Sequence, residues 1–152
     1  MNKNNIAALY SAILTKFLPP LEGFSSTPYW DYKQWSWGYG TRVPGSVNDQ
    51  NKKPTGTISR DKAMLDALQH VNGDYLYLKS LVKASLNANQ WSALLSFSYN
   101  LGRGNADNLV ANINAKNWPA LESQWKQYVY AGGVINSTLV NRREKEWNLF
   151  TT

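Results

Sequence analysis

Residues 22–41 read EGFSSTPYWDYKQWSWGYGT, and this stretch decides the fold class. Residues 29–31 and 35–40 are rich in aromatic side chains, which favour strands over helices. The three residues between them, 32–34, are expected to form a turn. The stretch therefore predicts a small β-hairpin.

The predicted second strand of this hairpin has two unlike faces. Successive side chains of a strand point to opposite sides, so Trp35, Trp37 and Tyr39 share one face. Ser36 and two glycines share the other face. We expect the face of small residues to stay open beside Asp31, so that a bulky ligand can approach the backbone closely.

The sequence on either side of residues 22–41 has helical periodicity. Apolar residues recur at steps of three and four over residues 6–18, which predicts an amphipathic helix on a core and argues against a signal peptide. From Ser59 onward the same spacing predicts a long helix, with Gly73 as a weak point. Its expected buried stripe consists of Met64, Leu68, Val71, Tyr75 and Leu78.

Helix-start signals divide the rest of the chain. Asn87 and Gln90 form a capping-box pattern before an apolar segment that ends at Gly102. Shorter helices are expected near Asn105, Asn117 and Ser137.

These elements together predict an α+β fold. We expect one domain over residues 1–152, because that length suits a single hydrophobic core. Its β-lobe is expected at about residues 24–57 and its helical lobe at about residues 59–150, joined by the long helix.

Composition narrows the possible functions. The chain has no Cys and a single His, His70, which excludes a thiolate nucleophile, a zinc-thiolate site and a histidine pair, and no metal or cofactor is expected. The net charge of +6 favours an anionic partner, but the basic residues are scattered, which argues against nucleic acid. No apolar run approaches the roughly 20 residues that span a bilayer, so no stable membrane insertion is expected.

Two carboxylates stand out, because Glu22 and Asp31 are the only acidic residues before Asp49. Cleavage of a glycosidic bond requires one carboxyl group that donates a proton and a second that activates water or stabilises positive charge. The spacing alone is equally compatible with a charge at a helix boundary and a turn residue.

The chain resembles the phage-type lysozymes of glycoside hydrolase family 24, which include the endolysins of T-even and lambdoid phages. Residues 22–41 are similar to the active-site segment of that family. The resemblance continues through QWSALLSFSYNLG (90–102) and LVNRREKEWNLF (139–150), in the family's order. It implies a lysozyme-like fold and a muramidase that cleaves the β-1,4 bond between N-acetylmuramic acid and N-acetylglucosamine in peptidoglycan.

The resemblance also implies roles for individual residues. Glu22 would be the general acid, and Asp31 would hold or activate the attacking water. Ser36 would replace the family's threonine, whose hydroxyl helps to fix that water. Tyr99 and Asn100 fall where the family's Phe-Asn pair binds the saccharide.

The chain departs from the family pattern near these residues. Four residues rather than five separate Asp31 from Ser36, so the turn is one residue shorter. Ser36 lacks the methyl group that restricts a threonine rotamer. Thr41 stands where the family usually has histidine, and the Pro19-Pro20 pair precedes the catalytic segment.

Two other functions remain open from the sequence. A lytic transglycosylase can operate with one glutamate, although the presence of Asp31 argues against it. A non-catalytic wall-binding module would retain the fold without activity. For the muramidase, inversion is expected, with carboxyl groups about 6.5–9.5 Å apart.

The same resemblance sets expectations for partners and location. Peptidoglycan is the expected partner, and a monomer is expected. Without a signal peptide, the enzyme would be made in the host cytoplasm. It would then reach the wall in the periplasm after release by a holin.

Overall fold

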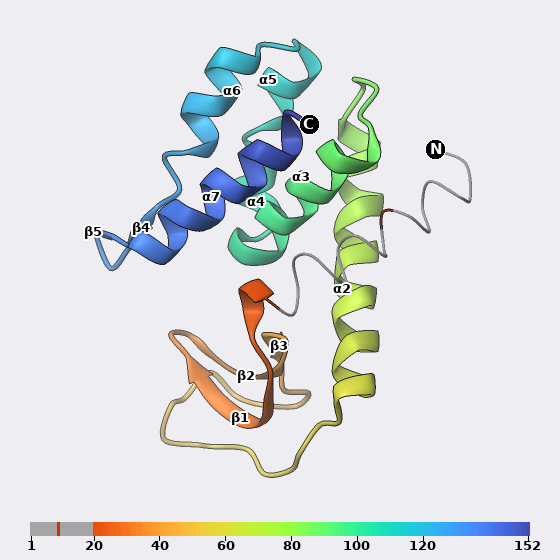
Figure 1. Cartoon of the computed structure of the whole chain (residues 1–152). Coiled ribbons are helices and arrows are strands. Elements are labelled where there is room, and N and C mark those ends of the chain that lie inside the picture. Colours follow the sequence, from red (N-terminus) through yellow and green to blue (C-terminus); the bar gives the residue numbers. More distant parts are fainter. Residues whose placement is uncertain (1–8, 10–19) are drawn as a thin grey trace. The chain divides into compact units, whose positions relative to one another are not determined.

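The computed structural model describes Leu9 and residues 20–152 (Figure 1). The helix predicted over residues 6–18 otherwise lies outside the described residues. The described residues divide into two compact units, one of residues 20–70 and the other of Leu9 and residues 71–152. Both strands and helices are present, so the α+β prediction is confirmed.

The unit of residues 20–70 contains a three-stranded antiparallel sheet, with its strands in the order β1-β2-β3. The strands are β1 (Ser25–Asp31), β2 (Gln34–Gly38) and β3 (Thr41–Arg42). The predicted hairpin is therefore present as β1 and β2. Pairing shifts register between Ser25 and Tyr29, where Pro28 cannot donate to the strand ladder.

The turn between β1 and β2 is tight. Gln34 pairs with Asp31, so only Tyr32 and Lys33 lie between the strands. The amide of Lys33 donates to the carbonyl oxygen of Asp31, which makes Tyr32 the centre of a γ-turn. Tyr32 has a φ of +52°, a left-handed conformation that is strained for a residue with a side chain. The short turn thus places Asp31 directly at the tip of the hairpin.

The second strand is shorter than predicted. The structure ends β2 at Gly38, and Tyr39 and Gly40 connect it to β3. The two glycines have φ values of +60° and +86°, which glycine adopts at little cost and other residues resist. The predicted strand therefore ends at Gly38, and Tyr39 and Gly40 form a turn.

The expectation of an open face along β2 was wrong. Ser36 is fully buried, and a Cβ atom on Gly38 would lie 2.8 Å from the Cβ of Ala63. Ala63 belongs to the helix α2 (Arg60–Leu81), whose backbone approaches closely because β2 carries only small residues here. Protein rather than ligand covers this part of the face. Only the end with Asp31 is exposed.

Helix α2 confirms the long helix predicted from Ser59, and it contributes to both units. Val71, Tyr75 and Leu78 are buried as expected. Met64 and Leu68 are only half-buried, because the buried stripe in the first half of the helix runs instead through Ala63 and Ala67.

The unit that contains residues 71–152 is mainly helical. After α2 come α3 (Ala88–Leu101), α4 (Arg103–Asp107), α5 (Val110–Asn114), α6 (Trp118–Trp125) and α7 (Ser137–Phe150). The capping box at Asn87 and Gln90 is present, and Gly102 ends α3. The starts predicted near Asn117 and Ser137 are confirmed by α6 and α7, whereas the helix predicted near Asn105 is two short helices.

Helix α3 forms the core of this unit. Residues 91–98 are all buried, and α3 packs along α7 (Figure 1). A charged cluster lies between the two helices, in which Glu146 bonds Arg142 and Arg143 of its own helix and also Ser96 of α3. All four of these residues are buried.

A second hairpin, which the sequence analysis did not predict, connects α6 to α7. Its strands are β4 (Tyr130–Ala131) and β5 (Val134–Ile135). Gly132 and Gly133 form the turn with φ values of +58° and +81°. Because the strands are two residues long, only this glycine pair signals them in the sequence.

Candidate functional site

The carboxyl group of Glu22 lies beside the glycine turn between β2 and β3. A Cβ atom on Gly40 would lie 3.8 Å from Oε2 of Glu22 and 3.9 Å from the hydroxyl of Tyr29. Glu22 is half-buried, and its Oε1 atom is shielded from solvent. The carboxyl group of Glu22 and the phenol of Tyr29 therefore both lie next to position 40 of this turn.

Asp31 and Ser36 share one face of the β1–β2 hairpin. Tyr29 pairs with Ser36, and Asp31 pairs with Gln34, so all four side chains project to the same side. Diagonal neighbours in such a pair are about 7–8 Å apart. The side chain of Gln34 donates to Oγ of Ser36 at 3.1 Å, which orients the hydroxyl. The hairpin thus brings together Asp31 and Ser36, the two residues predicted to handle water.

Tyr29 lies on this hairpin face, and its hydroxyl lies beside Gly40 as the carboxyl group of Glu22 does. Burial is the main cause that raises the pKa of its phenol above the ordinary value, and the negative charges of Asp31 and Glu22 raise it further. Both carboxylates therefore oppose ionisation of the same phenol. The sequence analysis gave Tyr29 no role, although its position two residues before Asp31 is the signal that places it on the same face.

We expect Asp31→Asn to lower the pKa of Tyr29 towards its ordinary value of about 10, because the substitution removes a negative charge that opposes ionisation. Phenolate absorbance measured against pH, with Tyr29→Phe subtracted in each background, isolates this titration. Asp107→Asn serves as the matched control, since Asp107 bonds Tyr77 and is not among the groups that act on Tyr29. A Tyr29 titration that Asp31→Asn leaves unchanged would contradict the arrangement.

Tyr99 and Asn100 belong to the other unit, in the last turn of α3, and both are half-buried. Nη2 of Arg143 donates to Oδ1 of Asn100 at 2.8 Å. A guanidinium has only donors, so it fixes the amide oxygen and leaves the NH₂ group of Asn100 as a donor for a further partner. The sequence analysis recognised the motif that contains Arg143 but gave this residue no role.

The described part of the chain holds no group of three or more His, Cys, Asp or Glu side chains that could bind a metal ion. Within the same residues, no helix has the length and apolar character needed to cross a bilayer.

Comparison with known proteins identifies one family model and two curated relatives, all of them phage lysozymes or endolysins by name. Residues 20–146 match the family model described as phage lysozyme. The chain is 32% identical over 105 residues to an endolysin of Bacillus phage B103, covering 65% of this chain and 38% of that protein. It is 29% identical over 122 residues to an endolysin of Bacillus phage PZA, and this match covers 79% of this chain and 45% of that protein. The chain thus spans less than half the length of these curated relatives.

Among solved structures, the muramidase domain of SpmX from Asticaccaulis excentricus has a similar fold. The TM-score is 0.76, and the match covers 95% of both chains at 19% sequence identity.

Proposed function

This chain belongs to the phage lysozyme family, and from that premise we propose that it hydrolyses the β-1,4 bond between N-acetylmuramic acid and N-acetylglucosamine in bacterial peptidoglycan. The observation that carries the proposal is the placement of the two carboxyl groups: Glu22 lies with Tyr29 beside Gly40, and Asp31 lies on the same hairpin face as Tyr29. Two carboxyl groups in one small region are the requirement for glycosidic cleavage.

The environments of the two carboxyl groups suit different roles. Glu22 is half-buried and one of its carboxyl oxygens is shielded from bulk solvent, and we assign it the role of the proton donor. Asp31 is exposed at the hairpin tip, where a water molecule can reach it. Glu22 would protonate the leaving glycosidic oxygen while the exposed Asp31 orients the water that attacks the sugar. Ser36 is fully buried, so its hydroxyl is not proposed to contact this water. We propose inversion, with this water on the opposite face of the sugar ring.

Tyr99 and Asn100 are proposed to bind the saccharide. Arg143 bonds the amide oxygen of Asn100, so the NH₂ group of Asn100 can donate to a carbonyl or hydroxyl oxygen of an amino sugar. In this role Arg143 is a positioning residue.

The experiment that tests the function is product analysis of purified peptidoglycan after digestion. Hydrolysis releases muropeptides with reducing N-acetylmuramic acid ends, detected by borohydride reduction and mass spectrometry. Anhydro-muramyl products would favour a lytic transglycosylase. Absence of any new ends from protein that still sediments with the wall would favour a binding module.

Location and partners follow from the same proposal. The curated relatives are endolysins of phages, which supports action on the host cell wall during lysis. Action in the periplasm stays a prediction. Release from the cytoplasm by a holin is part of the proposal, and lysis of host cells with and without a co-expressed holin checks it. Action as a monomer stays a prediction.

A further inference from the structure

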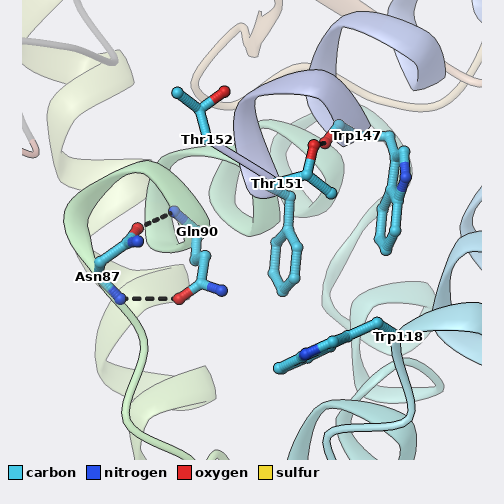
Figure 2. A pocket seen from close by; sticks show the side chains of 7 residues that line it. Asn87, Gln90, Trp118, Trp147, Thr151 and Thr152 are labelled. Carbon is cyan, nitrogen blue, oxygen red and sulfur yellow. Dashed lines mark hydrogen bonds between the residues drawn. The ribbon is translucent and has the colours of Figure 1, made fainter.

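A pocket of about 240 Å³ opens in the helical unit, between the start of α3, the start of α6 and the end of α7 (Figure 2). Its lining side chains include Asn87, Gln90, Trp118, Trp147 and Phe150, together with the threonines that follow α7. None of the lining residues carries a charged side chain. Aromatic rings beside uncharged amide and hydroxyl side chains favour a ligand that has both apolar and polar surface.

The aromatic side of the pocket is rigid. The rings of Trp147 and Phe150 stack with centroids 5.4 Å apart, and Trp118 meets Phe150 edge-on at 5.6 Å. Trp147 and Phe150 are buried, whereas Trp118 is half-buried and retains accessible ring surface. Because the ring contacts hold one another in place, the pocket offers a preformed apolar wall.

The polar side of the pocket is fixed by the capping box of α3. Oδ1 of Asn87 accepts from the backbone amide of Gln90 at 2.8 Å, and Oε1 of Gln90 accepts from the backbone amide of Asn87 at 2.9 Å. Both amide oxygens are thus occupied, which leaves the two NH₂ groups as donors. Figure 2 shows the side-chain nitrogen of Gln90 turned away from Asn87 and into the pocket.

The pocket lies well away from the proposed saccharide-binding residues of the same helix. Gln90 and Asn100 are ten residues apart on α3, which corresponds to about 15 Å along the helix axis. A ligand at Gln90 therefore occupies a separate position from a sugar unit held by Asn100.

We propose that this pocket binds one N-acetylated amino sugar of the glycan, as a second carbohydrate contact outside the catalytic site. An apolar C–H face of the pyranose ring packs on Trp118, and the acetamido oxygen accepts from the NH₂ group of Gln90. A stem-peptide carboxylate fits less well, because no cation lines the pocket. The inference rests on the proposed function for the source of the sugar. A second contact of this kind keeps the protein on a polymeric substrate between cleavage events by raising effective concentration.

The test is a titration of the full chain with N-acetylglucosamine, followed by the indole N–H signals of its tryptophans in a proton–nitrogen NMR spectrum. Trp118→Phe identifies the signal of Trp118. We expect this signal to shift in a saturable manner with N-acetylglucosamine but not with glucose, which lacks the acetamido oxygen. Performing the titration in Glu22→Gln keeps the readout independent of catalysis.

Gln90→Glu is the decisive variant. A glutamate keeps the oxygen that caps α3 but loses the NH₂ donors, so the helix start is retained while the affinity is expected to fall about tenfold. Gln50→Glu is the matched control, because it makes the same change at an exposed position outside the pocket. We expect Gln50→Glu to bind N-acetylglucosamine with the same affinity as the unchanged protein.

Two results would overturn the proposal: no shift of the Trp118 signal with N-acetylglucosamine, or equal affinity in Gln90→Glu and the unchanged protein. Failure of the proposed function is a different result. It would appear as an absence of new reducing ends from peptidoglycan, whatever the outcome of the titration.

Discussion

Replacing Glu22 with glutamine is expected to slow the release of new reducing ends from purified peptidoglycan by about 10²–10⁴-fold, the usual contribution of a general acid. Glutamine has nearly the shape of glutamate, so it can occupy the space beside Gly40 and Tyr29. It cannot transfer a proton to the leaving oxygen. The loss should therefore appear in the rate of bond cleavage rather than in folding.

Glu122→Gln is the matched control for this experiment. Glu122 of α6 forms an ion pair with Lys126 and belongs to a different compact unit from Glu22 and Asp31. We expect this variant to retain the rate of the unchanged protein. Circular dichroism and urea unfolding establish that Glu22→Gln is folded, and a folded variant with an unchanged rate would show that Glu22 is not the acid.

Glu146→Gln is expected to lower the free energy of unfolding by about 3–5 kcal/mol, because it breaks a buried ion cluster on one side only. Oε2 of Glu146 lies 2.8 Å from Nε of Arg143, and Oε1 lies 3.2 Å from Nε of Arg142. Ser96 and Trp125 also donate to this carboxylate, at 2.7 and 3.0 Å. A glutamine offers one accepting oxygen and sets its NH₂ group against other donors. Two buried guanidinium groups would then lack the carboxylate that they surround.

Glu144→Gln provides the comparison for the same substitution on α7. Glu144 is exposed and lies 3.1 Å from Lys126, and surface pairs of this kind contribute only about 0–1 kcal/mol. Urea unfolding of both variants measures the difference. If Glu146→Gln unfolds at the same urea concentration as Glu144→Gln, the buried cluster does not stabilise the fold in the way proposed.

Features that depend on nearby residues could be predicted from the sequence. The capping box needs only Asn87 and Gln90, which are three positions apart, and both of its bonds are present. The β1–β2 hairpin likewise follows from neighbouring aromatic strands and a short turn. In both cases the contacts that form the structure lie within a few residues.

Features that depend on distant residues could not be predicted. The alternation of side chains along a strand correctly places Ser36 and Gly38 on one face of β2. It does not reveal that Ala63 of α2 covers this face. Arg143 and Glu146 resemble surface charges in a helical segment. Their burial depends on partners in α3 and α6, up to 50 residues earlier in the chain.

The residues of the candidate site also divide into those that the sequence predicts and those that only the structure reveals. The spacing of Glu22 and Asp31 drew attention to both residues without any structure. Tyr29 emerges only when its distance to Gly40 and its response to both carboxylates are known. Arg143 emerges only through its bond to Asn100, which joins residues 43 positions apart.

The capping box also has an evolutionary consequence. Folding of α3 itself selects for an accepting side chain at Gln90, so most substitutions that would remove the pocket's donor also weaken the helix start. Glutamate is the main replacement that preserves the cap and changes the pocket. A descendant that no longer used the pocket would therefore tend to keep its polar wall for many generations.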